Sequence, residues 1–244
     1  MPDFRLGIQS YCFREIKAID EVIAMVKKVG VSSIELFPGH IGPDASDDEI
    51  REVRDKLEKE KIKIESCGVY NFTRNVEENK KIFRFATLLG VKIISADIDP
   101  DAIKLVDDQC VDFNVKLAVH NHGRSHRYGK VMQLKDLFKK ASSNIGLCLD
   151  TAWALDAGED PVKCISIFRE RILGLHLKDF KFSEDGKPAD VVTGEGGIKL
   201  EKLFQTLNEI NFWGFISLEY EGNPTDPLPD VIRCAEKVKG VLGK

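Results

Sequence analysis

The chain has 244 residues, 43% of them hydrophobic, and a net charge of −4. This acidic balance lacks the basic surface that binds a nucleic-acid backbone, and no apolar run reaches the roughly 18 residues of a membrane-spanning helix. The six cysteines form no CxxC pair, and the first residues, MPDFRLGIQSY, do not read as a signal peptide. We therefore expect a cytoplasmic globular protein with free thiols that binds neither nucleic acid nor a membrane.

Short apolar runs alternate with amphipathic segments along the whole chain. The predicted strands cover residues 5–11, 31–37, 62–69, 91–98, 115–122, 145–151, 171–179 and 214–222. The predicted helices follow them at residues 18–30, 46–61, 75–90, 100–112, 130–141, 160–170, 198–210 and 228–241. Eight strand–helix units without a linker predict a single (β/α)8 TIM barrel domain over residues 1–244. The lack of a GxGxxG motif after the first strand argues against a dinucleotide-binding fold.

Individual residues mark the ends of several predicted helices. Gly30 and Gly90 are expected to stop the first and third helices. Ser46 is expected to cap the second helix, which carries acidic residues in its first turn.

The last four predicted strands carry ionisable side chains near their carboxyl ends. These are His120 and His122 in LAVHNHG, Asp150 in IGLCLD, His176 in ILGLHLKD and Glu219 in GFISLEYEG. Because side chains alternate between the two faces of a strand, these groups share the inward face with small residues, and bulky aliphatic residues face the helices. The small inward residues are Ala118, Gly146, Cys148, Gly174 and Ser217. A parallel barrel delivers the carboxyl ends of its strands to one face, so we expect the ionisable groups to meet there.

Two or more imidazoles beside two carboxylates suit a borderline divalent ion such as Mn²⁺, Zn²⁺, Co²⁺ or Fe²⁺. Mg²⁺ prefers oxygen ligands and fits this set less well. A lone histidine in an apolar strand is usually a hydrogen-bonded core residue. Four such groups at neighbouring strand ends are harder to explain in that way, because uncompensated buried charges cost several kcal/mol each. The sequence therefore predicts one divalent metal ion at this end of the barrel.

The motifs HNHG, DTAW, HLKD, the GEG loop before the seventh helix and the final LEYEG resemble the xylose isomerase-like TIM barrel family. Within that family they are similar to the sugar phosphate isomerases/epimerases, and the resemblance covers nearly the whole chain. It implies one divalent ion bound at the ends of strands five to eight, which fall here on His120, Asp150, His176 and Glu219. It also implies isomerase or epimerase chemistry in carbohydrate metabolism.

At strand five the chain departs from the ketose 3-epimerase branch of the family. That branch has a glutamate at the position of His120, which shares the proton transfers with the strand-eight glutamate, and a histidine at the position of Trp153. Glu219 therefore lacks its usual partner, and His122 on the same inward face is the nearest second proton carrier. The other candidates for this role are Glu35, His40, Lys178 and Glu221.

Four side chains are candidates for substrate binding: Glu35, His40, Trp153 and Glu221. For Glu35 the alternative is a salt-bridged glutamate, and for His40 a surface-loop histidine. Trp153 could form an apolar wall for a sugar ring or simply pack.

Lys178 is a catalytic candidate because it points inward beside His176, where it could contact substrate oxygens or lower a neighbouring pKa. Its alternative is an ion pair with Asp150 or Glu219. Asp179 is expected to orient a metal ligand or to cap the following loop. His126 is expected to be a solvated loop residue.

The glycine-rich loop VVTGEGG at residues 191–197 lies where barrels often bind phosphate. Its glycines would allow close approach, but Glu195 puts a negative charge where a phosphate would lie. We therefore expect a neutral sugar, a keto-sugar or a polyol derivative.

These observations favour a metal-dependent isomerase or epimerase that acts next to the carbonyl of a carbohydrate through an enediolate. The main alternative is a lyase or dehydratase on a keto-sugar or keto-inositol, which shares the first step. An endonuclease IV-like DNA repair enzyme also shares the barrel, but it uses a histidine-rich three-ion cluster, and five histidines in an acidic chain argue against it. A noncatalytic barrel and a homodimer stay open.

Overall fold

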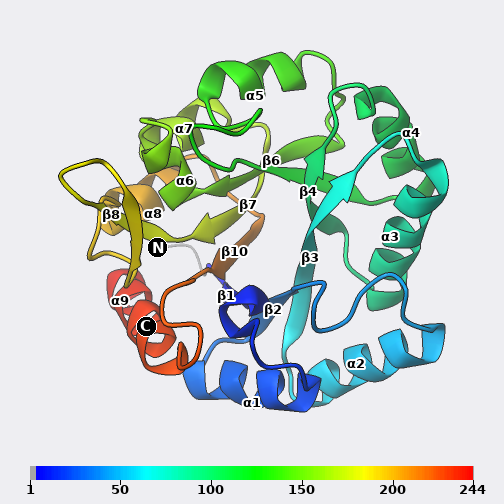
Figure 1. The fold of residues 1–244 in the computed structure, drawn as a ribbon, viewed down its shortest axis with the longest axis horizontal. Coiled ribbons are helices and arrows are strands. Elements are labelled where there is room, and N and C mark those ends of the chain that lie inside the picture. The colour runs from blue at the N-terminus through cyan, green and yellow to red at the C-terminus, as the bar shows by residue number, and fades with distance from the viewer. Residues whose placement is uncertain (1–3, 244) are drawn as a thin grey trace.

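Eight parallel strands form a closed barrel at the centre of the computed structural model, which describes residues 4–243 (Figure 1). Their order around the barrel is β1-β10-β7-β6-β5-β4-β3-β2. The strands are β1 (Leu6–Gln9), β2 (Ser33–Leu36), β3 (Lys63–Phe72), β4 (Ile93–Ile98), β5 (Lys116–His120), β6 (Ile145–Asp150), β7 (Ile172–Leu177) and β10 (Phe215–Leu218). The predicted (β/α)8 TIM barrel is thereby confirmed. Residues 1–3 and 244 of the predicted domain lie outside the described residues.

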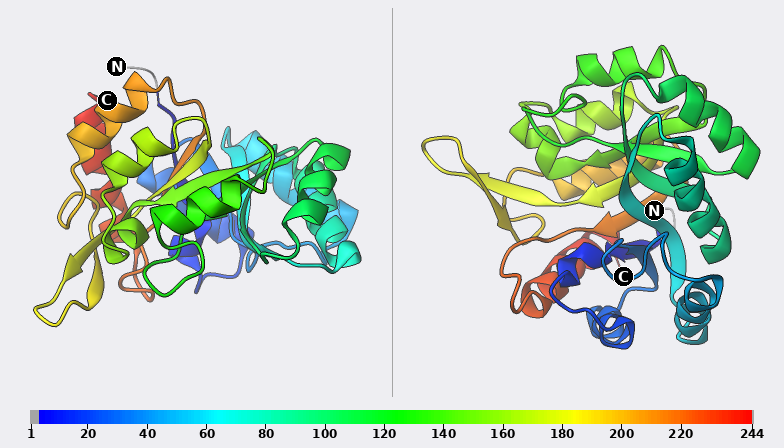
Figure 2. Two further views of the ribbon diagram at one scale, coloured as in Figure 1. Left: turned by 90° about the horizontal axis from the view of Figure 1, so that it is seen from above. Right: turned by 45° about the vertical axis from the view of Figure 1, so that its right-hand side comes forward.

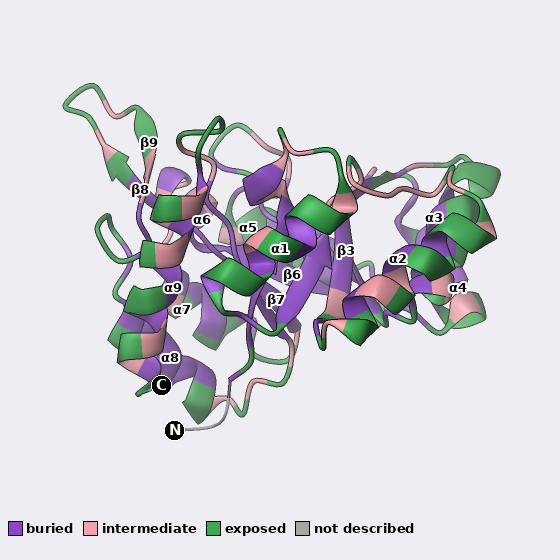
Figure 3. Cartoon of the chain, turned by 90° about the horizontal axis from the view of Figure 1, so that it is seen from below, coloured by how far each residue is buried: buried purple, intermediate pink, exposed green. Residues whose placement is uncertain are grey.

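Helices surround the barrel, and each turns an apolar side toward the strands and a polar side outward (Figure 3). The helices that follow the barrel strands are α1 (Ile19–Val29), α2 (Asp47–Lys59), α3 (Val76–Leu89), α4 (Ile103–Phe113), α5 (Val131–Phe138), α7 (Pro161–Ile167), α8 (Leu200–Glu209) and α9 (Leu228–Leu242). Each lies within a predicted helix or within one or two residues of it. Along the part of the chain that the structure describes, no helix has both the length and the apolar composition needed to cross a membrane.

The predicted helix ends are confirmed by their local geometry. The Ser46 hydroxyl accepts a hydrogen bond from the Glu49 backbone N–H, and the Glu49 carboxylate accepts one from the Ser46 backbone N–H. This reciprocal pair satisfies two of the N–H groups that open α2. Gly30 and Gly90 take left-handed conformations, with φ of 71° and 78°, in which glycine alone is free of a Cβ penalty.

Large and small residues complement each other inside the barrel. Phe215 and Leu173 form an interior cluster with Ile93, Ala118 and Cys148. A Cβ on Gly174 would overlap the Phe215 ring, and one on Gly146 would lie 2.7 Å from Leu173 Cγ. Leu173 reaches the interior because the pairing of β6 with β7 shifts register there, so that one extra residue enters β7. The small inward residues therefore make room for two large ones and leave the interior filled.

Three elements of the described chain were not predicted. They are the 3-10 helix η1 (Ser10–Phe13), the short helix α6 (Thr151–Asp156) and the antiparallel hairpin of β8 (Asp179–Phe182) and β9 (Pro188–Val191). The hairpin stands away from the barrel (Figure 2). It occupies the segment that the sequence suggested to be a long loop. One turn of helix and four-residue strands are too short for their periodicity to be distinctive.

Six barrel strands, β1, β2, β5, β6, β7 and β10, end earlier than predicted, while β3 runs on to Phe72. In three of them the shortening affects a candidate site residue. β5 ends at His120, β7 at Leu177 and β10 at Leu218, so His122, Lys178 and Glu219 lie just beyond their strands. Near these ends the side chains of Asn121 and Thr151 bond the neighbouring backbone, while the Glu219 N–H still donates to the Leu177 carbonyl.

Candidate metal centre

Four ionisable side chains converge at the carboxyl-terminal mouth of the barrel. His120 ends β5, Asp150 ends β6, His176 lies near the end of β7, and Glu219 directly follows β10. One ligand atom from each of them lies within 4.8 Å of the other three. These residues, called the quartet below, come from four strands that are adjacent in the barrel, which is why they meet although the chain separates them by up to 99 residues.

The quartet is buried but poorly supplied with hydrogen bonds. Among residues 4–243, both His120 nitrogens, Asp150 Oδ2 and His176 Nδ1 are buried without a hydrogen-bond partner. His120 Nε2 lies 3.5 Å from Asp150 Oδ2, and His176 Nδ1 lies 3.0 Å from Glu219 Oε2. Buried polar atoms are rarely left unpaired, because each costs free energy of folding. Unpartnered nitrogen and oxygen atoms aimed at one point fit a borderline divalent cation.

Burial changes the proton affinities within the quartet. It raises the pKa of Asp150 to about 7 and lowers the pKa of His120 to about 3. Burial would also raise the pKa of Glu219, but His176 and Lys178 outweigh it and hold that pKa well below its ordinary value. The metal-free site therefore combines a neutral His120 and an ionised Glu219 with an Asp150 that loses its proton only near neutrality, and a cation would favour the ionised form of Asp150.

Two polar side chains outside the quartet tie the strand ends together. The Asn121 amide accepts a hydrogen bond from the Asp150 backbone N–H at 2.8 Å and donates one to the Asp150 carbonyl at 3.0 Å. The Thr151 hydroxyl accepts from the Lys178 backbone N–H at 3.1 Å and donates to the Lys178 carbonyl at 2.6 Å. Asn121 thus links β5 to β6, and Thr151 links β6 to β7. Neither contact was predicted from the sequence, although each residue is polar and lies next to a predicted ligand.

Glu35, near the end of β2, also reaches the quartet. Its carboxylate is fully buried, and Oε2 lies 2.9 Å from His176 Nε2. The carboxylate accepts the hydrogen bond of that N–H. Glu35 therefore contacts a quartet residue in this structure, whereas its predicted contact with substrate stays a prediction.

His122 lies beside the quartet and outside it. Its side chain is exposed, and its ring centre lies 5.3 Å from that of His120 and 4.7 Å from that of Trp153. Neighbouring groups still desolvate part of the ring and, with a smaller effect of His120, lower its pKa, so the imidazole is neutral near pH 7. His126 is partly buried instead of solvated, because its Nε2 lies 3.2 Å from Asp97 Oδ2.

Lys178 is almost completely buried next to acidic side chains. Its ammonium group pairs with Glu221, lies 3.8 Å from Asp190 Oδ1 in β9, and lies 5.2 Å from the Trp153 ring centre. Burial opposes the charge on Lys178, but Glu219, Asp150 and Glu221 outweigh it and raise the pKa above its ordinary range. Lys178 is therefore a permanent cation. The sequence predicted neither its pairing with Glu221 nor the contribution of Asp190.

His40 contacts residues of η1. Its Nδ1 lies 3.0 Å from Ser10 Oγ, and its Nε2 lies 3.2 Å from the Phe13 carbonyl oxygen. Burial lowers its pKa. Both ring nitrogens are thus engaged away from the quartet, and a substrate contact of His40 stays a prediction.

Asp179 binds the glycine-rich loop from inside. Its two carboxylate oxygens accept hydrogen bonds of 2.8 to 3.2 Å from four backbone N–H groups of this loop. The donors are Gly194, Gly196, Gly197 and Ile198. Glu195 points away and pairs with Arg233 and Lys237 on α9. The N–H groups that could have held a phosphate are therefore occupied by a carboxylate of the chain itself.

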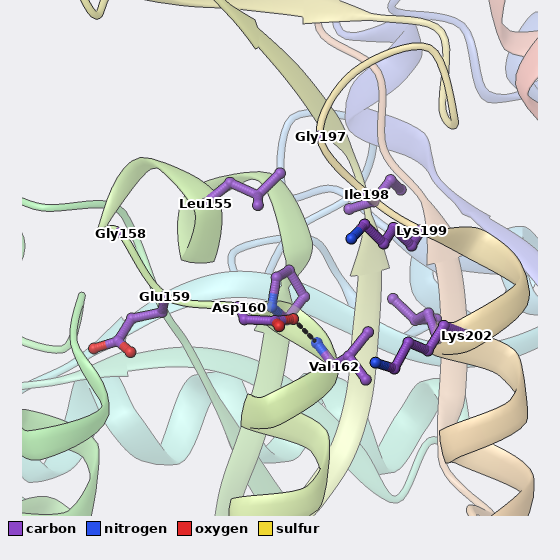
Figure 4. A pocket seen from close by; sticks show the side chains of 11 residues that line it. Leu155, Gly158, Glu159, Asp160, Val162, Gly197, Ile198, Lys199 and Lys202 are labelled. Carbon is purple, nitrogen blue, oxygen red and sulfur yellow. Dashed lines mark hydrogen bonds between the residues drawn. The ribbon is translucent and has the colours of Figure 1, made fainter.

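A cavity of about 410 Å³ lies elsewhere, between the α6–α7 connection and the start of α8 (Figure 4). Its wall includes Leu155, Asp160, Lys199 and Lys202, and the Asp160 carboxylate accepts a hydrogen bond from the Val162 N–H. None of the quartet lines it. The chemistry-bearing residues are thus at the barrel mouth and not in this cavity.

A closed parallel barrel with two histidines and two carboxylates gathered at its mouth is typical of metal-binding barrel proteins. The chain belongs to the xylose isomerase-like TIM barrel family, whose model matches residues 23–238.

The proteins similar to this chain carry different names. An inosose dehydratase of Clostridium botulinum (strain Alaska E43 / Type E3) is 26% identical over 149 residues, which cover 52% of this chain and 48% of the relative. The chain thus spans about half the length of the curated relatives it matches. Two solved structures share the fold. The probable 3-DHS dehydratase AsbF of Bacillus anthracis is 16% identical, with a TM-score of 0.79 and coverage of 97% of this chain and 99% of that one. The IOLI protein with a bound zinc atom is 18% identical, with a TM-score of 0.77 and coverage of 98% of each chain.

Proposed function

We propose that this protein is a metal-dependent enzyme that removes a proton next to the carbonyl of a carbohydrate and returns it to give an isomer or epimer. The observation that carries the proposal is the buried quartet, whose ligand atoms lie within 4.8 Å of one another and include several without a hydrogen-bond partner. The two nitrogen and two oxygen ligands favour Zn²⁺, Mn²⁺, Co²⁺ or Fe²⁺ over Mg²⁺. The zinc atom named for the IOLI structure supports this choice.

His120, Asp150, His176 and Glu219 would hold the ion. When bound, it would polarise the carbonyl and an adjacent hydroxyl and thereby acidify the C–H between them. The burial of the quartet keeps bulk water from these ligands, which strengthens every electrostatic interaction there.

Glu219 and His122 are our candidates for the two proton carriers. Glu219 is ionised at neutral pH, and it stands where the ketose 3-epimerase branch of the family has a proton-transferring glutamate. His122 is exposed, neutral near pH 7 and outside the quartet, so its imidazole is free to accept or donate a proton. The Trp153 ring, whose centre lies 4.7 Å from that of His122, offers an apolar surface beside which the carbon skeleton of a sugar could lie.

Lys178 can stabilise negative charge on the substrate. It keeps its proton at neutral pH, and its ammonium group lies beside both Glu221 and the Trp153 ring. A fixed cation near a developing oxyanion lowers the barrier to enolisation. Glu221, half-buried and paired with Lys178, would accept hydrogen bonds from substrate hydroxyl groups.

The substrate that we propose carries no phosphate or carboxylate. Two cations at the mouth already face carboxylates: Lys178 faces Glu221, and Arg127 pairs with Asp97 and Asp99. Arg14 donates to the Glu221 carbonyl oxygen. The N–H groups of the glycine-rich loop are taken by Asp179. A neutral keto-sugar or polyol derivative would not need a free cation.

A dehydratase is the second candidate, and the names of the inosose dehydratase and 3-DHS dehydratase relatives support it. It would begin with the same proton removal and would differ in losing a hydroxide from the neighbouring carbon. His122, once it has taken the substrate proton, could donate it to that leaving group, which departs as water.

Proton exchange tests both candidates. Metal-loaded protein would be incubated in D₂O with a panel of keto-sugars and keto-inositols, and the products would be followed by NMR and mass spectrometry. We expect deuterium at the carbon next to the carbonyl, with an isomer or epimer of unchanged composition. A product lighter by one water would establish the dehydratase instead. Stable metal binding without exchange on any member of the panel would indicate a noncatalytic barrel.

A further inference from the structure

Glu35 and His176 are the most deeply buried oppositely chargeable pair at the barrel mouth. Both side chains are fully buried, and Glu35 Oε2 lies 2.9 Å from His176 Nε2. The two residues come from β2 and β7 and are separated by 141 residues in the chain. The contact is thus a product of the closed barrel.

This hydrogen bond leaves one particular nitrogen of His176 free. A neutral imidazole carries its proton on one nitrogen and an accepting lone pair on the other. In the neutral ring that a metal ion requires, Nε2–H stays directed at Glu35 and the lone pair lies on Nδ1. Nδ1 is the atom that lies 3.0 Å from Glu219 Oε2 and has no hydrogen-bond partner within residues 4–243. The pair therefore turns a ligating nitrogen toward the quartet.

The burial of Glu35 costs free energy of folding. Its second oxygen, Oε1, is also buried and has no hydrogen-bond partner among the described residues. A buried carboxylate with an unpaired oxygen destabilises the folded state, since its hydration is lost and only partly replaced. An apolar residue at the same place would avoid that cost but would leave the His176 Nε2–H without an acceptor, so the place of the glutamate in the fold is tied to His176.

We propose that Glu35 is a positioning residue that fixes the ring and the tautomer of His176 for metal binding. This inference rests on the metal-dependent function proposed above. Glu35 acts through His176, whose ligating nitrogen it aligns and makes more basic.

Metal affinity of variants tests the inference. Zn²⁺ would be titrated into metal-free wild type, Glu35→Gln and Glu35→Ala in competition with a chromophoric chelator. The glutamine has nearly the same shape and keeps an accepting oxygen, while the alanine has none. We expect Glu35→Ala to weaken Zn²⁺ binding by about 10- to 100-fold and Glu35→Gln by less. Removal of a carboxylate that hydrogen-bonds a histidine ligand from outside the metal site has effects of about this size.

Two further measurements separate positioning from a structural role. The melting temperature of metal-free Glu35→Gln should stay close to that of the wild type, since the glutamine keeps an oxygen that accepts the His176 N–H. The absorption spectrum of the Co²⁺-loaded protein should change in Glu35→Ala and be partly restored in Glu35→Gln. Glu65→Gln is the matched control, because Glu65 pairs with Arg5 and Lys63 on the surface, and it should bind metal like the wild type.

The possible failures are distinct. If both Glu35 variants bind Zn²⁺ as tightly as the wild type while Asp150→Asn does not, Glu35 has no positioning role and the metal site stands. If the metal-free Glu35→Gln protein melts far below the wild type with unchanged affinity, Glu35 is structural. If the wild type itself binds no divalent ion, the proposed function fails and this inference fails with it.

Discussion

Neighbouring histidines in HNH have different surroundings in the folded chain. His120 is 4% exposed and contributes to the quartet, whereas His122 is exposed and stacks near Trp153. One residue, Asn121, separates them, and its side chain is committed to the Asp150 backbone. The same short motif thus supplies a buried imidazole of the quartet, an amide that ties β5 to β6, and an exposed imidazole.

The two histidines should therefore respond differently to substitution. We predict that His120→Ala weakens metal binding, and that His122→Ala keeps the metal and loses on the order of 10² or more in turnover, as expected for a general acid–base group. Metal content and turnover would be measured on the same samples. Loss of the ion in His122→Ala with retention in His120→Ala would reverse the assignment.

Much of the quartet could be predicted from residues alone. Strand alternation gives the face of each side chain, and the parallel barrel gives the common end. Neither gives the reach of a side chain across the barrel, so the contact of Glu35 with His176 was not predictable. Side-chain-to-backbone bonds such as those of Thr151 were missed for a similar reason: they depend on where two neighbouring strands stop pairing.

At the level of elements, the regular strands and helices were predictable and the additions between them were not. The eight strand–helix units show long periodic patterns. Helix α6 has only six residues, and its start depends on Asp150, whose Oδ1 accepts the Trp153 N–H at 2.8 Å. The β8–β9 hairpin pairs two strands of four residues across a connection that contains Asp185 and Gly186. Both additions follow directly from a predicted ligand strand.

Asp179 is expected to hold the glycine-rich loop in place. Asp179→Ala would leave the four N–H groups of residues 194–198 without their acceptor, and hydrogen bonds to a charged group stabilise by more than neutral ones. We predict a loss of at least about 2 kcal/mol in unfolding free energy, measured by urea denaturation. Asp185→Ala at the exposed tip of the hairpin is the control and should change little. Equal stability of the two variants would show that water replaces the carboxylate at no cost.

Acid should weaken the whole molecule partly through Asp97. Burial would raise the pKa of Asp97, but its pairing with His126 and Arg127 outweighs this and holds the pKa below its ordinary value. A lowered carboxyl pKa stabilises the fold above the unfolded value of about 3.9, and the stabilisation is lost as the pH falls through the native pKa.

We therefore predict that the melting temperature of Asp97→Asn lies below that of the wild type at neutral pH, and that the difference shrinks below about pH 4. Thermal melts from pH 3 to about 7 would measure it. Asp101→Asn, with a 65% exposed side chain, should show no such trend. A difference that is constant over the whole range would mean that Asp97 is not ionised preferentially in the folded state.

Removal of the metal should lower the stability of the entire barrel. An ion that binds only the folded state adds about 2.7 kcal/mol at a free concentration 100 times its Kd. In a protein of this size that corresponds to a fall of roughly 5–10 °C in Tm on chelation. The same chelator should leave Asp150→Asn unchanged, since the asparagine can still cap α6 but is a poor metal ligand. A similar fall in both proteins would point to an ion bound elsewhere.

The hydrogen bonds of Asn121 and Thr151 fix the spacing of the ligands before an ion binds. They join β5 to β6 and β6 to β7 just where three members of the quartet lie. The entropy of ordering these backbones is lost when the barrel folds and not when the ion arrives. The site therefore imposes its own spacing on the ion, and metals that need a different spacing should bind more weakly than their place in the Irving–Williams order suggests.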